Sequence, residues 1–280
     1  MNIHQAIQEA KLILKEKKIK SLDLDTQILM TKVLKKDRKF IILNPTKEIS
    51  NQSLKYFKNL VIKRSKGEPV AYLVKKKYFW KYEFIVSKDV LIPRPDTELI
   101  VEQVLKLTRN RQRLSLLDIG IGSGCILLSI LKDKKNFYGT GIDISKKTLN
   151  ICKINSQNLD ITNRLKLFKS DIDNFHFGKY DLIISNPPYI KKNEIKYLDR
   201  DIVGFEPLRA LDGGVDGLSE INKVINRSSE LIKKNGFLIL EINYNQKRFV
   251  KKLLENKGFF IKNVIKDLSN NDRCIISVKI

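Results

Sequence analysis

Apolar residues recur every three or four positions through the first 67 residues, which is the spacing of helices with one buried face. Ser21 and Ser50 are placed to cap the second and third of three predicted helices, and Gly67 lies just beyond the end of the third. The positions that we expect to face inward are Ile3, Ile7, Ala10 and Leu14, then Leu24, Ile28, Leu29 and Val33, then Leu54, Phe57 and Val61. Because short helices are unstable alone, this pattern predicts a small helical bundle.

The hydrophobic period shortens towards two over residues 78–92, where Phe79, Tyr82, Phe84 and Val86 predict paired strands, a hairpin. No catalytic constellation occurs in these strands or in the helices before them. The helical part is therefore suited to docking a partner, although a purely structural packing role would give the same pattern.

Strands and helices alternate through the rest of the chain. Pro93-Arg94-Pro95-Asp96-Thr97-Glu98 is typical of a helix start, because proline and acidic residues favour the first turn. Short apolar runs then predict buried strands over residues 114–119, 137–142, 164–168, 180–184, 236–242, 259–264 and 274–278, with helices over 99–107 and 146–157 and two more that end near Lys234 and Lys257. This order predicts an α/β fold, with a mainly parallel sheet covered on both faces.

A glycine-rich turn, Asp118-Ile119-Gly120-Ile121-Gly122-Ser123-Gly124, follows the first strand of the predicted sheet. Glycines permit a tight turn and let the backbone approach a ligand closely at the start of the next helix. A dinucleotide-binding fingerprint would need glycine or alanine at the next position, where Cys125 stands. The observed spacing is instead the glycine pattern of many sheets that bind a methyl donor.

Acidic residues follow the next two predicted strands. Asp143 ends the second strand, about 20 residues after the glycine turn, where a carboxylate can bind both hydroxyls of a ribose. Asp171 lies just past the third strand, where it can accept a hydrogen bond from an adenine amino group, and Ile172 can pack against the adenine ring. Asp171 alone would equally suit a loop-capping role. The three strand ends together predict a nucleoside-binding site.

The fourth strand of the sheet runs into Ser185-Asn186-Pro187-Pro188-Tyr189-Ile190. The prolines end the strand because they donate no backbone hydrogen bond, so Asn186 lies at the carboxyl edge, where open α/β sheets bind ligands. The Asn186 side-chain oxygen and the Pro187 carbonyl are both acceptors, and together they can hold an NH2 group and aim its nitrogen. Because such a nitrogen is a poor nucleophile, we expect catalysis by positioning and charge stabilisation. Alone, the run would also fit a strand-ending turn with a capping asparagine.

The formal net charge of the chain is +23, which favours a nucleic acid or another anionic partner. The lysines are spread through the whole chain beside many isoleucines and asparagines, as a coding bias towards A and T would produce, so nucleic-acid binding stays possible but is not required. The scattered residues Cys125, Cys152 and Cys274 predict neither disulfides nor a metal site, and we expect a cytoplasmic protein without a membrane segment.

With these motifs the chain resembles the bacterial release factor N5-glutamine methyltransferases, the HemK family. The resemblance covers nearly the whole length and includes the helical domain, Leu91-Ile92-Pro93-Arg94-Pro95-Asp96-Thr97-Glu98, the glycine turn, Asn186-Pro187-Pro188-Tyr189 and Phe205-Glu206-Pro207. Nucleic-acid N6-adenine methyltransferases share the Asn-Pro-Pro-Tyr motif, but its combination with Pro-Arg-Pro-Asp-Thr-Glu is more specific.

The resemblance implies a class I, Rossmann-like methyltransferase fold, S-adenosylmethionine as the methyl donor, no metal, and the glutamine of a Gly-Gly-Gln loop in translation release factors as the acceptor. The donor would be bound by Gly120, Ile121, Gly122, Ser123 and Gly124 around the methionine part, Asp143 at the ribose, and Asp171 and Ile172 at the adenine. Asn186, Pro187, Pro188 and Tyr189 would hold the glutamine amide, with Asn186 also next to the donor. The chain would divide into a substrate-docking domain (residues 1–70), a β-hairpin linker (71–92) and a methyltransferase domain (93–280).

The chain departs from the family where Lys75, Asn243 and Asn270 replace the usual glycines. Asparagine tolerates the left-handed conformation better than other non-glycine residues, so two of these changes are mild. We expect Lys75 to adopt an ordinary backbone conformation. The three positions lie outside the predicted site and bear on linker and loop geometry.

Two rival functions fit parts of the sequence. A DNA or RNA adenine N6-methyltransferase would use the same amino-binding site, and would have to extract its base and stack it, for which Tyr189 would serve either substrate. A non-enzymatic RNA-binding or assembly protein could retain the fold, but the intact motifs at residues 120–124 and 186–189 argue against it.

Overall fold

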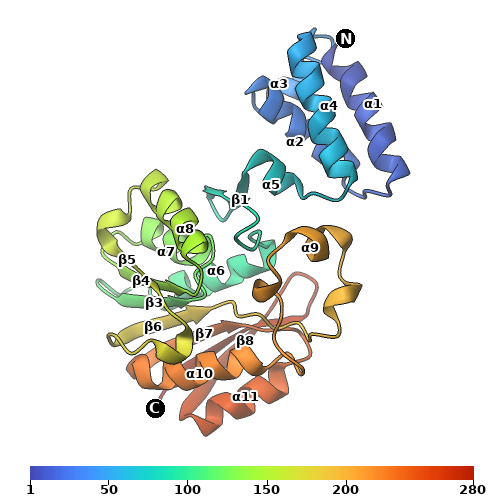
Figure 1. Cartoon of the computed structure of the whole chain (residues 1–280). Coiled ribbons are helices and arrows are strands. Elements are labelled where there is room, and N and C mark those ends of the chain that lie inside the picture. Colours follow the sequence, from blue (N-terminus) through green and yellow to red (C-terminus); the bar gives the residue numbers. More distant parts are fainter. The chain divides into compact units, whose positions relative to one another are not determined.

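The computed structural model describes all residues from 1 to 280, and the chain forms two compact units (Figure 1). The first unit comprises Met1–Lys76 and Asp199–Phe205, and the second comprises Lys77–Leu198 and Glu206–Ile280. The helices of the first unit are α1 (Ile3–Glu16), α2 (Leu22–Leu34), α3 (Arg38–Leu43), α4 (Asn51–Ser65), α5 (Val70–Val74) and α9 (Arg200–Phe205).

The predicted helical bundle is present and has an apolar interior. Ile3, Leu14 and Phe57 are each at most 1% exposed, and they pack in one cluster. Ser50 caps α4 as predicted, because its side chain accepts a hydrogen bond from the Ser53 backbone N–H at 3.2 Å. The short helices α3 and α5 were not predicted, since neither is long enough to show a helical period.

Two expectations for α2 are wrong. Ser21 stands at the start of the helix, but its hydroxyl donates to the Asp25 carboxylate at 2.8 Å and does not cap the backbone. Leu24 faces solvent with 44% of its surface exposed, because the buried face of α2 runs through Asp25 and Leu29. The acidic residue occupies the place that the apolar pattern assigned to a leucine.

Asp25 is buried because it pairs with Arg64 of α4. The Arg64 Nε lies 2.7 Å from the Asp25 carboxylate, and the two residues are 6% and 5% exposed. The same guanidinium donates to the Gly67 carbonyl and lies 3.6 Å from Asp201 of α9. Charges that are removed from water are stable only when they are paired and hydrogen-bonded. The cluster of Asp25, Arg64 and Asp201 therefore joins α2, α4 and α9.

The second unit is built on one sheet with the strand order β5-β4-β3-β6-β7-β9-β8. Its strands are β3 (Ser115–Ile119), β4 (Tyr138–Asp143), β5 (Leu165–Lys169), β6 (Tyr180–Ser185), β7 (Ile232–Glu241), β8 (Phe259–Lys266) and β9 (Asp272–Lys279). The pairs from β5 to β7 are parallel, whereas β9 runs antiparallel to β7 and β8. The predicted α/β class with a mainly parallel sheet is confirmed.

Helices cover both faces of this sheet (Figure 1). They are α6 (Glu98–Leu107), α7 (Cys125–Asp133) and α8 (Lys146–Asn158) on one face, and α10 (Ser219–Leu231) and α11 (Lys247–Asn256) on the other. Leu116 and Leu182 pack towards the first group, whereas Leu117 and Ile183 pack towards the second. Successive strand residues point to opposite faces, so a strand covered on both sides reads as a continuous apolar run.

The predicted hairpin is formed by β1 (Lys76–Phe79) and β2 (Tyr82–Ile85) as a separate two-stranded sheet. The indole of Trp80 and the hydroxyl of Tyr82 both donate to the carboxylate of Asp133 at the end of α7. Phe79 and Phe84 also pack into the core cluster that includes α6 and α7, and the backbone of Ile85 bonds to the Asn155 side chain of α8. The hairpin is therefore held within the second unit by both apolar and polar contacts.

Some local expectations need correction. Lys75 adopts the left-handed conformation, with φ of 63° and ψ of 24°, because it ends α5 at a position that favours glycine. Asn270 is also left-handed, with φ of 64°, whereas Asn243 is not. The predicted helix up to Lys234 ends at Leu231, where β7 begins. None of the helices has the length and apolar character that a membrane span requires.

Candidate active site

A cavity of about 460 Å³ lies at the carboxyl ends of β3, β4 and β6. Most of the predicted site residues line it: Gly120, Ile121, Gly122, Ser123, Asp143, Asp171, Ile172, Asn186, Pro187 and Pro188. The strands are parallel, so residues that follow them in the sequence meet at one edge. The structure therefore brings the predicted donor and acceptor residues to one cavity, and leaves Gly124 and Tyr189 outside its lining.

The glycine turn forms one wall of the cavity. Gly120, Gly122 and Gly124 have φ of 75°, 58° and 83°, values that other residues rarely adopt. A side chain on Gly120 would meet no atom within 4 Å, so the space above this residue is open to a ligand. A side chain on Gly124 would lie 2.7 Å from the Cys152 sulfur, so glycine is required here for packing against α7 and α8.

Burial sets the charge around this turn. It raises the pKa of Asp118 to about 8 and that of the Cys125 thiol to about 12. Cys125 therefore stays a neutral thiol, and Asp118 is largely protonated at neutral pH. Asp143, at the end of β4, is one of the acidic residues that line the cavity.

Asp143 is held by backbone donors from two segments. Its carboxylate accepts from the Ser145 N–H at 2.9 Å and from the Gly122 N–H at 3.3 Å. Burial raises the pKa of Asp143, and these two hydrogen bonds oppose the shift. A carboxylate has about four acceptor positions, so it can still bind the hydroxyls of a ribose.

Asp171 and Ile172 form the far end of the cavity. Ile172 is 7% exposed and offers an apolar surface. The Asp171 carboxylate accepts from the Asp173 N–H at 3.1 Å, which is the loop-capping role considered above. This bond leaves the second carboxylate oxygen of Asp171 without a bond in the protein, so capping and adenine binding are compatible.

Asn186 lies directly after β6, and its orientation is fixed by a residue that the sequence did not assign to the site. The Asn186 Nδ2 donates to the Thr97 hydroxyl oxygen at 3.2 Å. An amide that donates through its nitrogen presents its oxygen on the other side, as required of an acceptor for the substrate. The signal for Thr97 was its place in the Pro-Arg-Pro-Asp-Thr-Glu motif, where it was interpreted as part of a helix start.

The chain that follows Asn186 is held by a close glycine contact. Ile190 bonds to Leu211 and Gly213 through its backbone, at 3.1 and 2.8 Å. A side chain on Gly213 would lie 2.8 Å from the Tyr189 Cα and 2.9 Å from the Pro188 carbonyl oxygen. Glycine is therefore required here for the loop to approach Pro188 and Tyr189.

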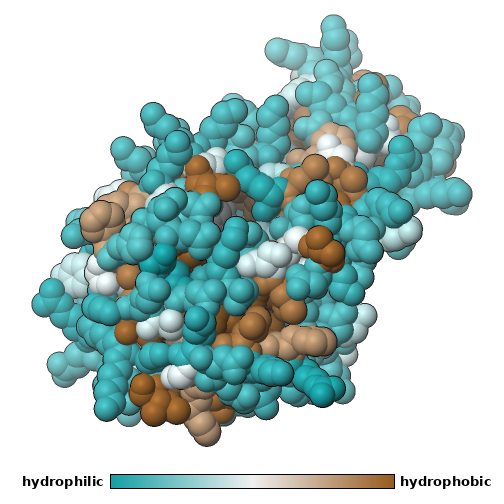
Figure 2. Space-filling view, turned by 60° about the horizontal axis from the view of Figure 1, so that its bottom comes forward, coloured by the Kyte–Doolittle hydropathy of each residue, from teal (hydrophilic) through white to brown (hydrophobic).

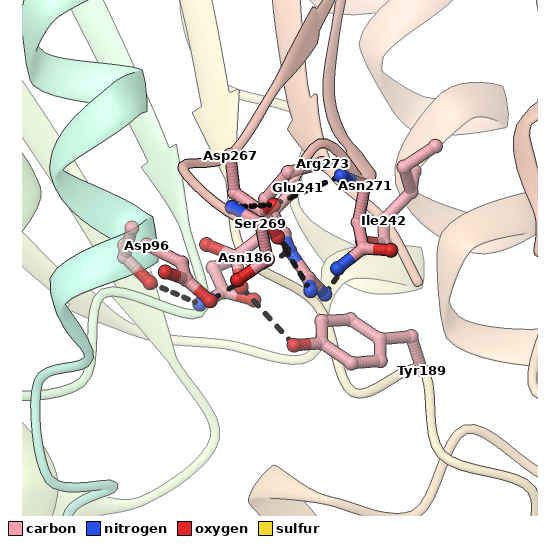
Figure 3. A network of polar contacts seen from close by, with 10 residues as sticks. Asp96, Asn186, Tyr189, Glu241, Ile242, Asp267, Ser269, Asn271 and Arg273 are labelled. Carbon is pink, nitrogen blue, oxygen red and sulfur yellow. Dashed lines mark hydrogen bonds and ion pairs between the residues drawn. The ribbon is translucent and has the colours of Figure 1, made fainter. Parts of the chain in front are cut away.

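Two further acidic residues near the cavity were missed. Glu206 is 5% exposed and accepts from the Ile92 N–H at 3.1 Å and from the Arg94 guanidinium, which joins two of the motifs that carried the resemblance. Glu241 ends β7 and accepts from the Tyr189 hydroxyl at 3.1 Å (Figure 3). The sequence did indicate Glu241, because it is a glutamate at the end of an otherwise apolar strand.

Comparison with known families and proteins agrees with this geometry. Residues 5–74 match the family described as PrmC N-terminal domain, and residues 95–203 match the Methyltransferase small domain. A methyltransferase structure from Pyrococcus furiosus is 19% identical, with a TM-score of 0.53 over 70% of this chain and 88% of that one. A ribosomal protein L11 methylase from Lactobacillus delbrueckii is 16% identical, with a TM-score of 0.51 over 73% and 90%. These structures confirm the predicted class I methyltransferase fold.

Curated relatives identify the family more closely. Proteins named release factor glutamine methyltransferase from Clostridium acetobutylicum, Caulobacter vibrioides and Buchnera aphidicola are 38%, 34% and 36% identical to this chain. Each alignment covers 100% of this chain and 99%, 97% and 99% of the relative, respectively. The chain therefore belongs to the family of release factor glutamine methyltransferases.

Proposed function

We propose that this chain transfers a methyl group from S-adenosylmethionine to the side-chain amide nitrogen of the glutamine in the Gly-Gly-Gln loop of translation release factors. The observation that carries this proposal is the orientation of Asn186. Its Nδ2 is bonded to Thr97, so its oxygen is the free acceptor, and no protein group donates to the neighbouring Pro187 carbonyl. These acceptors fit the two hydrogens of an amide NH2.

The cavity suits the proposed donor. The open space above Gly120 accommodates the methionine part, Asp143 the ribose, and Ile172 with Asp171 the adenine. The donor supplies an electrophilic methyl group on a sulfonium, and the residues of this chain bind and orient the two reactants. Asn186 and Pro187 hold the nitrogen in line with the methyl group, and their negative oxygen dipoles stabilise the positive charge that develops on it as the nitrogen–carbon bond forms and the sulfur–carbon bond breaks. The donor would leave as a neutral thioether, and the nitrogen would release one of its two hydrogens as a proton.

Tyr189 differs from the other proposed site residues. Its side chain is bonded to Glu241 and packs against the core between β6 and α10, so it supports the substrate-binding segment from behind. Burial and the neighbouring Glu241 carboxylate raise the pKa of Tyr189, so its hydroxyl stays protonated. We therefore assign Tyr189 to positioning of the Asn186–Pro188 backbone.

The helical unit is the proposed docking element for the release factor, and the cytoplasm is the proposed setting because the substrate belongs to the translation machinery. Because the net charge of +23 favours nucleic-acid binding, nucleic acids are included among the acceptors to be tested.

Figure 2 shows that hydrophilic side chains cover most of one face of the molecule, with apolar surface confined to separate patches.

The proposal is tested by methyl transfer from labelled donor. The acceptors are a release factor, the same protein with the loop glutamine changed to glutamate, and duplex and single-stranded DNA and RNA. We expect label on the first acceptor alone. Label on a nucleic acid but not on the release factor would reject the assigned substrate, and label on the glutamate version would reject the assigned residue.

The ribose assignment gives a separate prediction. Asp143→Ala is expected to weaken donor binding by about 1.5–3 kcal/mol, the range for hydrogen bonds to a charged group. Asp143→Asn keeps the shape and one acceptor, so its loss should be smaller. Isothermal titration calorimetry of the folded variants measures both effects, and wild-type affinity in Asp143→Ala would contradict the assignment.

A further inference from the structure

Thr97, Glu241 and Asn186 come from distant parts of the chain and meet at the wall of the cavity, which Thr97 and Asn186 line and Glu241 does not. Ser185 of β6 pairs with Leu240 of β7 in parallel register, so Asn186 and Glu241 are the next residues of two adjacent strands. Thr97 ends the short turn before α6, and Asp96 beside it faces the same cluster (Figure 3). Thr97 and Glu241 are 3% and 2% exposed, so water does not reach them freely.

The hydrogen-bond pattern of this group is incomplete in a specific way. Asn186 donates to the Thr97 oxygen, which leaves the Thr97 hydroxyl hydrogen without an acceptor among the hydrogen bonds of the structure. The Oε1 of Glu241 accepts from Tyr189, whereas its Oε2 is buried without any hydrogen-bond partner. A buried carboxylate oxygen without a donor is costly, and it lies in the same cluster as a hydroxyl with a spare hydrogen.

The effects of its neighbours on the pKa of Glu241 are consistent with an interaction between these two groups. Burial raises the pKa of Glu241, and the hydroxyl of Thr97 opposes that shift more than any other neighbour, ahead of Tyr189 and Arg273. The Arg273 guanidinium is itself paired with Asp267 at 3.0 Å and lies 3.9 Å from Asp96. Catalytic hydrogen bonds are often long in the free enzyme and shorten when substrate binds.

We propose that Thr97 and Glu241 form a positioning relay. In this relay Glu241 accepts a hydrogen bond from the Thr97 hydroxyl, and the Thr97 oxygen accepts one from the Asn186 Nδ2. The Asn186 oxygen is thereby fixed towards the substrate. Without a defined acceptor for its nitrogen, an asparagine amide can rotate by half a turn and present NH2 to the substrate NH2. Glu241 does not line the cavity, so it acts through Thr97 and Tyr189 and not on the substrate. The kinetic part of this inference rests on the proposed function.

The relay gives Thr97 a role that a merely structural threonine does not have. Thr97→Val keeps the shape and removes the hydroxyl, whereas Thr97→Ser keeps the hydroxyl. We expect Thr97→Val to lower kcat by about 10- to 100-fold, and Thr97→Ser to recover most of it. Donor affinity should change by less than about threefold, because the donor contacts proposed above lie elsewhere. Thr108→Val is the matched control, since Thr108 is also buried, lies at the other end of α6, and its hydroxyl donates to the Val104 carbonyl of that helix.

Glu241→Gln tests the other end of the relay. It is isosteric, but its amide offers one acceptor oxygen in place of two. We expect kcat to fall as in Thr97→Val, and the double variant to be no slower than the slower single one, because groups that act as a unit are not additive. Wild-type kcat in Thr97→Val, or two effects that multiply, would overturn the relay.

A second measurement does not depend on the identity of the substrate. In protein labelled with 15N-asparagine, the Asn186 side-chain NH2 signals are assigned by their absence in Asn186→Asp. Their exchange with water should be slow in the wild type and Thr97→Ser, and faster in Thr97→Val and Glu241→Gln. Unchanged exchange in all variants would reject the relay. Slow exchange in the wild type together with no methylation of release factor would reject the proposed function alone.

Discussion

Asn186→Ala is expected to lower turnover on release factor by about 100-fold or more, the loss that follows when a group that aims the reacting atoms is removed. The variant removes the oxygen that accepts one amide hydrogen and leaves the Pro187 carbonyl to hold the other. Donor affinity should be largely unchanged, since the proposed donor contacts come from the glycine turn, Asp143 and Asp171. Single-turnover kinetics and donor titration separate the two effects.

The structure changes the expectation for Asn186→Asp. If Asn186 acted only as an acceptor, aspartate would retain more activity than alanine. Its nitrogen also donates to Thr97, however, so aspartate would replace a donor by an acceptor and place a second negative charge near Glu241. We therefore expect Asn186→Asp to be impaired to a degree similar to alanine.

The control for these variants is Asn243→Ala. Asn243 lies two residues after Glu241, outside the cavity lining, and has an ordinary backbone conformation. It should retain wild-type turnover. Full activity of Asn186→Ala on every acceptor would contradict the proposed amide-binding site. An inactive Asn243→Ala would show that turnover is lost whenever the structure near the site is destabilised.

Arg64→Ala is expected to destabilise the helical unit by about 3–5 kcal/mol, because it leaves the buried Asp25 carboxylate without its partner. Lys58→Ala is the matched control on the same helix. Lys58 pairs with Glu9 at 3.0 Å, but both side chains are about half exposed, so its loss should cost about 1 kcal/mol or less.

Two optical signals distinguish the units in this experiment. Trp80 is the single tryptophan and lies in the second unit, so its fluorescence follows that unit during denaturation. Circular dichroism at the helix wavelength follows both units. We expect Arg64→Ala to shift the dichroism transition to lower denaturant concentration with little change in the Trp80 transition. Equal stability of Arg64→Ala and Lys58→Ala would contradict the assigned role of the buried pair.

Sequence patterns were sufficient where local chemistry determines the structure. The prolines after Asn186 end β6, and the glycines at positions 120 and 122 need positive φ, so the place of both motifs at the sheet edge followed from residue types alone. The alternation of strands and helices likewise predicted the sheet, since parallel strands need crossover connections.

The supporting contacts were not predictable because their partners are distant in sequence. Thr97 and Asn186 are separated by 89 residues, and Tyr189 and Glu241 by 52. Ser21 shows the converse failure, in which a local rule was overridden by tertiary structure. A capping role was expected for it, but the Asp25–Arg64 pair recruits its hydroxyl. Lys75 was also misjudged, because a helix end and not residue preference sets its backbone.

The inclusion of Asp199–Phe205 in the helical unit has a consequence for biosynthesis. The chain leaves this unit after Lys76 and re-enters it more than a hundred residues later, so the ribosome has made most of the sheet before the unit is complete. The ion pair between Arg64 and Asp25 can form early in synthesis, whereas the contact between Arg64 and Asp201 can form only after residue 201 has been made. The units are also joined by three passages of the chain, so a protein that begins near Tyr78 would lose α1–α5 and leave α9 without its neighbours. These seven residues, which lie far from the amino terminus in sequence, therefore constrain both folding during synthesis and the removal of the helical unit by truncation.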